Sequence, residues 1–430
     1  MKRILIIGAD MLNKQHAAGI TLSSIFDQIE PQYLMGVAWG TKELDAKPGR
    51  IRIRRLDYNF FSIGRLLDNV YLKKISRRIK QAGQTHATNQ DSGHTMSTAF
   101  RLLKNIREWI ALMPSKAKVK VTVEDLKEIK KFAPDVIYTV GESVAALDLT
   151  YRLSRMLEIP IVIHFMDNWK NSIEWASNPF LKSYQKQLTR KCNQCYERST
   201  ECIAVSQGMA NAYAKETGVK HSVVMNSIDA KTFHLPPKKC EGEVRFVYAG
   251  GLHLGRNVAL RTIGECIDRL CEETGVKANF SIYTSKENIE LYVADFARLK
   301  YTFLYPAVPH EEITKVYSQA DVLVHAESDS QSNNEFFKYS VSTKMSEYLA
   351  SGRTVMFWGP DNIYLYDFLK DNGIAYTASN ESEAEDLLRM FIKGNYENLA
   401  DKAYTYATAH FDIHVALQAF CETIDNVALP

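Results

Sequence analysis

Two stretches of the sequence repeat one pattern, in which an apolar, β-branched run leads into glycine and then into a segment of helical periodicity. The first is RILIIGAD at residues 3–10, and the second is VRFVYAGGLHLG at residues 244–255. Similar apolar runs follow each of them, separated by longer amphipathic segments. Strands that alternate with helices in this way are typical of parallel sheets covered by helices on both faces. The chain is therefore predicted to be an α/β protein with two Rossmann-like halves.

The predicted strands form two groups. They are expected at residues 3–7, 33–38, 51–55, 135–140, 160–164, 202–205 and 222–225 in the first half, and at 244–249, 279–283, 302–304, 321–325, 354–358 and 374–377 in the second. The segment HLPPKKCEGE between the groups has two prolines and a cluster of charges, which is typical of a linker. We predict one domain over residues 1–237, a second over 238–410, and a C-terminal helix within 411–430 that packs back on the first domain.

Length and composition fit a globular protein with more than one core. At 430 residues the chain exceeds one ordinary core, and 24% charged with 46% hydrophobic residues is usual for soluble proteins. No run approaches the roughly 18 to 20 apolar residues of a membrane span, and the first apolar run is far too short for a signal peptide. The seven cysteines lack framework spacing, so a reducing, cytoplasmic location is expected.

One pair of cysteines has a spacing that is found in metal sites. Cys192 and Cys195 form a C-x-x-C, and Cys202 follows closely. A zinc site would need a second pair, or histidines at ligand spacing, and the neighbouring sequence has neither. The segment around the pair is expected to be a polar helix, so no metal site is predicted there.

The stretch VSTKMSEYLASGRTV at residues 341–355 predicts a helix that begins after the strand-like ADVLVHA. Ser342 and Thr343 suit its N-terminus, because their hydroxyls can accept free backbone N–H groups. Helical spacing places Lys344 and Glu347 together, away from an apolar stripe. One interpretation is a surface helix with an ordinary ion pair. The other is a nucleotide site, since a lysine at a helix N-terminus suits phosphate and a carboxylate suits the adjacent hydroxyls of a ribose.

Two common nucleotide motifs are missing. Neither glycine loop is a G-x-G-x-x-G with an acidic residue at the spacing that a dinucleotide needs, and no G-x-x-x-x-G-K-[ST] is present. A nicotinamide-dependent dehydrogenase and a P-loop protein are therefore disfavoured.

Six stretches, in their order along the chain, resemble retaining nucleotide-sugar glycosyltransferases of the family 4 type, which have the GT-B fold. They are Ala18-Gly19 after the first strand, IVIHFMDNW (161–169), CIAVSQGMANAY (202–213), NSID (226–229), YAGGLHLGRN (248–257) and STKMSEYLASGRTV (342–355). The resemblance implies two Rossmann-like domains that face each other across a deep cleft. The first would bind the acceptor and the second the nucleotide-sugar donor.

The resemblance also implies which residues bind the donor. Family members hold the diphosphate with two cations in a loop that here reads GGLHLGRN, so Arg256 takes the lysine position and Gly251 the first arginine position. Lys344 is expected to supply the second charge, and Glu347 matches the glutamate that binds the ribose. The family's other glutamate falls on Tyr339. The full set expected at the donor is Gly19, Gly250, Gly251, Arg256, Ser342, Thr343, Lys344 and Glu347.

The residues implied in catalysis are Arg256, Lys344, Asp167 and His164. The two cations would meet the negative charge that grows on the departing diphosphate. Asp167 and His164 lie in HFMDNW at the end of a predicted buried strand, and they would lie near the donor sugar. Glu327 and Asp329 in ESDS only faintly match the spaced carboxylates of metal-dependent sugar transferases, so neither a metal nor a cofactor is expected.

The implied activity is transfer of a sugar from a UDP- or GDP-type donor to a lipid-linked or glycan acceptor, as in bacterial surface polysaccharide biosynthesis. Two alternatives stay open. A GT-B-fold sugar-nucleotide epimerase would need positioned acid and base carboxylates. A non-catalytic nucleotide-sugar sensor or scaffold would fit the missing first arginine and first glutamate.

Positive charge is concentrated in residues 50–131, which hold 19 Lys and Arg against 7 Asp and Glu, whereas the rest of the chain holds 34 against 43. Within this region, MSTAFRLLKNIREWIALM (96–113) combines apolar residues at helical spacing with basic residues and Trp109. This combination favours a helix that lies on an anionic membrane surface at the inner face of the membrane. An ordinary packed helix is the main alternative. Nucleic acid is not expected as a partner, because no recognition motif accompanies the charge.

Replacing Arg101, Lys104 and Arg107 with glutamine should release the protein from anionic vesicles. Each basic residue near such a surface contributes about 1 kcal/mol, and the attraction fades over roughly 8 Å at physiological salt. Vesicle flotation should show wild type bound to anionic but not to neutral liposomes, with less binding at higher salt. Wild type that stays in the soluble fraction at low salt would identify an ordinary packed helix.

Overall fold

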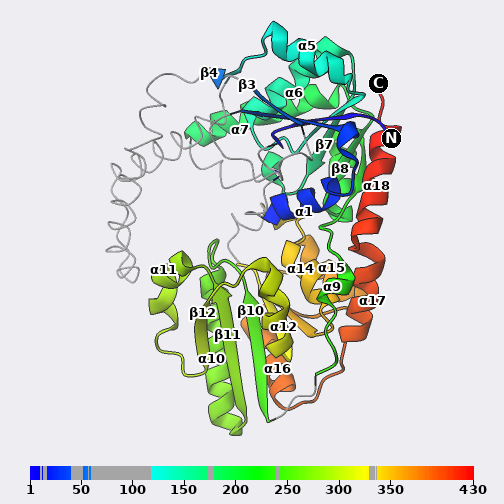
Figure 1. The fold of residues 1–430 in the computed structure, drawn as a ribbon. Helices are drawn as coiled ribbons and strands as arrows, with labels where there is room; N and C mark the ends of the chain where they lie inside the picture. The colour runs from blue at the N-terminus through cyan, green and yellow to red at the C-terminus, as the bar shows by residue number, and fades with distance from the viewer. Residues whose placement is uncertain are drawn as a thin grey trace. The chain divides into compact units, whose positions relative to one another are not determined.

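The computed structural model describes residues 1–9, 12, 17–39, 52–56, 58–59, 118–171, 179–238, 242–328, 335 and 337–430. The chain forms two compact units, which Figure 1 shows with the chain coloured along its length. Unit 1 comprises Met1–Ile203, Asn211–Ser222 and Cys421–Pro430. Unit 2 comprises Ala204–Ala210 and Val223–Phe420.

The first sheet has its earliest strand near the middle. Its strand order is β3 (Arg52–Leu56), β2 (Leu34–Trp39), β1 (Ile4–Ile7), β6 (Val136–Thr139), β7 (Ile161–Phe165), β8 (Glu201–Ala204) and β9 (Lys220–Val223). The neighbouring pairs from β3 to β7 are parallel. A separate antiparallel pair joins β4 (Tyr58–Asn59) to β5 (Lys118–Val119). All residues of β1, β6 and β7 are buried, which explains why the sequences of these strands are mainly apolar.

Helices connect the strands of this sheet. They are α1 (Ala17–Phe26), α5 (Val123–Phe132), α6 (Val144–Leu157), α7 (Pro179–Tyr196) and α8 (Gln207–Thr217). Helix α5 begins with a capping box, in which the side chains of Thr122 and Asp125 bond each other's backbone N–H groups. Asp125 is also 2.6 Å from Nε of Arg54, so this cap ties α5 to β3.

The second sheet is parallel at every pairing. Its order is β12 (Thr302–Pro306), β11 (Lys277–Thr284), β10 (Glu243–Ala249), β13 (Val322–Ala326), β14 (Thr354–Trp358) and β15 (Tyr376–Ala378). The helices of this part of the chain are α9 (Ala230–Phe233), α10 (Arg256–Thr274), α11 (Lys286–Phe296), α12 (Ile313–Gln319), α14 (Thr343–Ala350), α15 (Tyr364–Asn372), α16 (Glu381–Ile392), α17 (Ala400–His410) and α18 (Ile413–Asn426).

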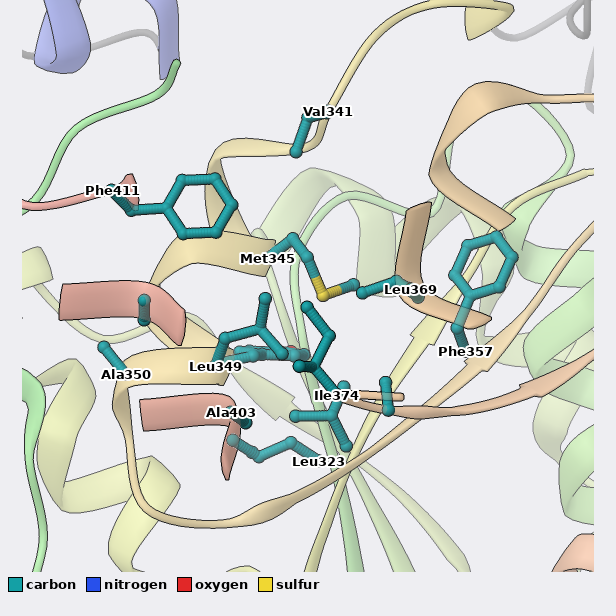
Figure 2. Packing of buried hydrophobic residues seen from close by; sticks show 14 of the residues in the cluster. Leu323, Val341, Met345, Leu349, Ala350, Phe357, Leu369, Ile374, Ala403 and Phe411 are labelled. Carbon is teal, nitrogen blue, oxygen red and sulfur yellow. The ribbon is translucent and has the colours of Figure 1, made fainter. Parts of the chain in front are cut away.

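Unit 2 has an apolar core on each face of its sheet. Successive side chains of β10 enter different cores, with Phe246 packing beside residues of α10 and α16, and Val247 beside residues of α14 and α17. Figure 2 shows the core that contains Val247, where Met345 and Leu349 of α14 lie among apolar side chains of the sheet and of neighbouring helices. Alternation along a strand with apolar residues on both sides is what a sheet between two helical layers requires.

Every strand predicted from the sequence overlaps one of these strands, and the prediction of two Rossmann-like halves is confirmed. The segment 96–113 and most of the basic region 50–131 lie outside the described residues, so the membrane surface stays a prediction. No helix in the described part of the chain is both long enough and apolar enough to span a membrane.

The units divide the chain earlier than the predicted boundary at residue 238. Residues from Val223 onward belong to unit 2. Ile228 forms a parallel bridge with Asp412, and the side-chain amide of Asn226 donates to the carbonyl of Val341, so this stretch is bonded within unit 2. The end of the chain returns to unit 1, where the ammonium of Lys2 donates to the carbonyl of Val427 at 2.6 Å.

Leu349→Ala should lower the free energy of unfolding by about 2 to 5 kcal/mol, because Leu349 is fully buried and truncation leaves a cavity. Urea unfolding of both forms measures the difference. Leu291→Ala is the matched control, since Leu291 lies in α11 of the same unit and is 52% exposed. Equal unfolding energies for Leu349→Ala and wild type would contradict the core shown in Figure 2.

Candidate functional site

The candidate site lies in unit 2 at the carboxyl ends of β10 and β13. These strands are neighbours, but the sheet continues from β10 toward β11 and from β13 toward β14, so the strand order reverses between them. The helices that follow, α10 and α14, contribute to the cores on opposite faces of the sheet. Ligands of open parallel sheets bind in the crevice that such a reversal leaves. Two stretches identified in the sequence, 248–257 and 342–355, contain the residues that follow these strands.

The loop after β10 is a tight turn that ends in the first residue of α10. Its start is held by two bonds, from the Gly250 N–H to the carbonyl of Tyr283 at 2.8 Å and from the Tyr248 hydroxyl to the carbonyl of Gly251 at 2.7 Å. Its end passes through left-handed backbone at Leu254 (φ 61°) and Gly255 (φ 82°). The turn delivers Arg256 at the helix N-terminus, as the loop pattern predicted.

Arg256 is bound to a carboxylate from the end of the neighbouring strand. Its Nε lies 3.0 Å from Oε2 of Glu327, and its Nη2 lies 2.8 Å from Oε1. The guanidinium also lies 5.4 Å from the ring centre of Phe337. Glu327 thus occupies the Nε–Nη2 edge of the guanidinium, a carboxylate contact that the sequence did not predict. Asp329, the other residue of the ESDS pattern, lies outside the described residues.

Glu327 is ionised and nearly enclosed. It is 5% exposed, and its Oε1 lies 3.0 Å from Nε2 of His325. Burial alone would raise the pKa of this carboxyl, but the charge of Arg256 and the bond to His325 lower it to about 2. Burial lowers the pKa of His325, which is fully enclosed, so the ring is neutral and donates through Nε2. Arg256, Glu327 and His325 therefore form one bonded chain of side chains.

Lys344 is the second cation at this place. It occupies the first turn of α14, and its ammonium lies 5.4 Å from the ring centre of Tyr248. Among the described residues no carboxylate forms an ion pair with it. Burial and the charge of Arg256 lower its pKa to about 8. Gly250 lies close by, since a Cβ at that position would be 2.0 Å from Nζ. The glycine thus leaves room for the ammonium beside the loop.

Glu347 lies one turn further along α14 and is 9% exposed. Its Oε2 accepts a hydrogen bond from the Tyr317 hydroxyl at 2.6 Å, and its Oε1 lies 3.0 Å from Nε2 of His310. The carboxylate is therefore held on one side by a buried tyrosine and on the other by a half-exposed histidine. Each oxygen keeps a second acceptor position, as binding of two hydroxyls would require.

The remaining predicted residues of α14 and its loop are present at the same helix start. Ser342 occupies the N-cap position, as predicted, but its side chain makes no capping bond with the described residues. Thr343 is the first helical residue, and its carbonyl accepts from the Ser346 hydroxyl at 2.8 Å. Tyr339, at the position of the missing family glutamate, accepts a bond at its carbonyl from the Ser206 hydroxyl at 2.6 Å.

Three predicted residues belong to unit 1. Gly19 is buried within α1, the helix after β1. His164 is 1% exposed, and its Nδ1 lies 2.7 Å from the hydroxyl of Tyr138, which favours a structural role for this histidine. Asp167 follows β7 and is partly exposed. Loss of solvent, followed by the charge of Asp167, raises the pKa of Glu142 to about 7.

Sequence reasoning missed several residues of these networks. They are Glu142, Tyr248, His310, Tyr317 and His325. Glu142 lies two residues after a predicted strand and could have been found by that position. The others occupy ordinary strand or helix positions, so no local signal marks their side chains as polar partners. Among the described residues, no group of three or more His, Cys, Asp and Glu side chains is arranged to hold a metal ion.

No family model matches the sequence, and no curated protein matches it either. Solved structures match over almost the whole chain. Anabaena Alr3699/HepE in complex with UDP-glucose shares 12% identity, with 99% of this chain and 100% of that chain covered and a TM-score of 0.57. S. aureus TarM in complex with fondaparinux, alpha-GlcNAc-glycerol and UDP shares 11%, covering 99% and 100%, with a TM-score of 0.55.

A third match is a glycosyltransferase from Rickettsia africae ESF-5, at 11% identity, covering 98% of this chain and 97% of that chain, with a TM-score of 0.57. Likeness at these identities shows the fold. The chain has the GT-B fold, as the sequence resemblance implied.

Lys344 should lose its proton near pH 8 in the folded protein, whereas an ordinary lysine does so near 10.5. Because the unfolded chain then binds more protons between these values, the contribution of this lysine to stability rises with pH across that window. The measurement is modification of Lys344 by an amine-specific reagent, followed by peptide mass spectrometry across pH 6 to 11. A half-reaction pH at the ordinary lysine value would contradict the environment described above.

Proposed function

We propose that the chain is a glycosyltransferase that moves a sugar from a nucleotide-diphosphate sugar to a lipid-linked or glycan acceptor. The observation that carries the proposal is Lys344, a cation at a helix start with no carboxylate ion pair among the described residues. It lies at the strand-order reversal, beside a glycine, where parallel sheets bind ligands. A cation at a helix N-terminus favours an anionic ligand.

The rest of the site fits a nucleoside diphosphate. Arg256 at the start of α10 adds a second cation, and helix N-termini favour negative charge. Glu347, held by Tyr317, offers a carboxylate one turn from Lys344, where a ribose next to the phosphates would present its hydroxyls. Structures with the same fold provide support from other proteins, since HepE was solved with UDP-glucose and TarM with UDP.

The proposed mechanism places positive charge where negative charge develops. When the bond between the anomeric carbon and the phosphate oxygen breaks, the electron pair stays on the nucleoside diphosphate. Lys344 and Arg256 stabilise that charge in the transition state more than in the ground state, which is the condition for catalysis. We propose retention of the anomeric configuration from the sequence resemblance, with Asp167 rather than His164 as the unit 1 residue that meets the sugar.

Cellular placement is part of the proposal. An acceptor in surface polysaccharide assembly would require the enzyme at the inner face of the membrane, and the basic, amphipathic segment 96–113 is suited to bring it there.

A second candidate function is a sugar-nucleotide epimerase, and one observation favours it. Glu142, with a pKa of about 7, lies close enough to Asp167 to respond to its charge. A carboxyl that titrates near neutral pH beside a second carboxylate is suited to proton transfer. An epimerase would change the sugar of the donor while leaving the nucleotide attached.

The deciding experiment incubates the purified protein with UDP- and GDP-sugars and a membrane lipid extract. A transferase should release nucleoside diphosphate and form a glycosylated product. Lys344→Met should lower kcat by on the order of a hundredfold, because one group that stabilises the leaving charge is lost. Lys315→Met is the control, since Lys315 is an exposed lysine on α12 of the same unit.

Other outcomes of this experiment would indicate a different function. An altered sugar on an intact nucleotide, abolished by Glu142→Gln, would identify the epimerase. Nucleotide-sugar binding without any turnover would leave the sensor or scaffold. Absence of nucleotide binding altogether would overturn the proposed function.

A further inference from the structure

The orientation of Arg256 is important for donor binding, because this loop has lost one of the two cations that the resemblance implies. Of the two basic positions that the resemblance expects in this loop, one is Gly251, so Arg256 is the arginine or lysine that remains in GGLHLGRN. An arginine side chain has several rotatable bonds, and about 2 kcal/mol of rotamer entropy opposes holding it in one place. A catalytic arginine therefore needs something that fixes its direction.

Glu327 is placed to provide that direction. Two bonds, at 3.0 and 2.8 Å, hold both the Nε and the Nη2 of Arg256, so the plane of the guanidinium is fixed as well as its position. The backbone of Glu327 is fixed too, because its N–H donates to the carbonyl of Trp358 in β14 at 2.9 Å. On the other side, the Phe337 ring lies 5.4 Å from the guanidinium.

His325 fixes the carboxylate in turn. It lies within β13, is fully buried, and its ring stacks on Phe357 of β14 with 5.8 Å between the ring centres. Its Nε2 lies 3.0 Å from Oε1 of Glu327, the same oxygen that accepts from Nη2 of Arg256. The support of Arg256 thus runs from the sheet through two buried side chains.

Stability does not explain this arrangement. Removing a carboxylate and a guanidinium from water costs so much that apolar residues of similar volume are often equally stable or better. The structure adds a further cost, because Nδ1 of His325 is buried and has no hydrogen-bond partner among the described residues. A network that gains little stability, at the place where the proposed donor binds, is better explained by what it positions.

We infer that Glu327 and His325 are positioning residues for the transferase reaction, Glu327 holding the guanidinium of Arg256 toward the donor diphosphate and His325 holding Glu327. This inference rests on the proposed function and deepens it. Glu327 could affect donor binding in two opposite ways. A positioning carboxylate helps the nucleotide to bind, whereas a carboxylate that merely competes for Arg256 hinders it.

The test measures binding of UDP and GDP by calorimetry together with kcat and KM. Glu327→Gln should weaken binding of the nucleotide that wild type prefers and should lower kcat/KM, by on the order of tenfold to a hundredfold, as expected for a misplaced catalytic group. In the Arg256→Ala background, the same substitution should add almost nothing, because the residue through which Glu327 acts is gone. Glu385→Gln is the control, since Glu385 forms ion pairs with Arg269 and Arg389 in the same unit and takes no part in the proposed site.

His325 provides a second pair of variants that leaves the ion pair intact. His325→Gln keeps an N–H donor for Glu327 and should retain most of the activity. His325→Phe keeps the stacking on Phe357 but removes the donor, so it should lower kcat/KM while the melting temperature stays close to that of His325→Gln. This pair decides the question if Glu327→Gln does not fold.

Each contrary result has a definite meaning. Tighter nucleotide binding by Glu327→Gln would show competition and overturn the inference, as would fully additive effects of Glu327→Gln and Arg256→Ala. Wild-type behaviour of Glu327→Gln and of His325→Phe would also overturn it, while nucleotide binding by wild type would leave the proposed function standing. If wild type binds no nucleotide, the proposed function fails and this inference fails with it.

Discussion

The position of β10 within its sheet is the constraint on which the site depends. The strand pairs with β11 on one edge and β13 on the other, and its side chains enter two apolar cores. Pairing on both edges and burial of Phe246 to Ala249 fix where the strand ends, and therefore where the turn toward Arg256 begins. Because β13 is paired with β10 and β14, Glu327 also leaves the sheet at a fixed point. Two opposite charges, 71 positions apart in sequence, meet there as a consequence of sheet register.

The two cations of the site are in different electrostatic states. Arg256 forms an ion pair with Glu327. The charge of Arg256 lowers the pKa of Lys344, and the charge of Glu327 raises it. Glu327 therefore offsets part of the repulsion between the two cations. Glu327 thus orients the guanidinium of Arg256, whereas no carboxylate of the described residues pairs with the ammonium of Lys344. A bound anion would balance the positive charge of Lys344.

The sequence was sufficient for the fold and for the backbone of the site. Apolar, β-branched runs located most of the strands, and the glycine loop and the Ser-Thr pair located the starts of α10 and α14, because these signals are local. Hydrogen-bond partners could not be found in this way. Nothing near Glu347 indicates Tyr317, and nothing near Arg256 indicates Glu327, since both pairings arise only when separate strands and helices assemble. The burial of His164 against Tyr138 likewise depends on two neighbouring strands.

The division of the chain between its two units has a consequence for synthesis. Unit 1 contains Met1–Ile203 but also Cys421–Pro430, and Lys2 bonds to Val427 while Thr200 bonds to Ala428. The ribosome makes these last residues only after all of unit 2. Unit 1 therefore stays incomplete until residues 421–430 have been made, whereas the last residue of unit 2 is Phe420. The contacts of Lys2 with Val427 and of Thr200 with Ala428 are therefore expected to form after unit 2 has been synthesised.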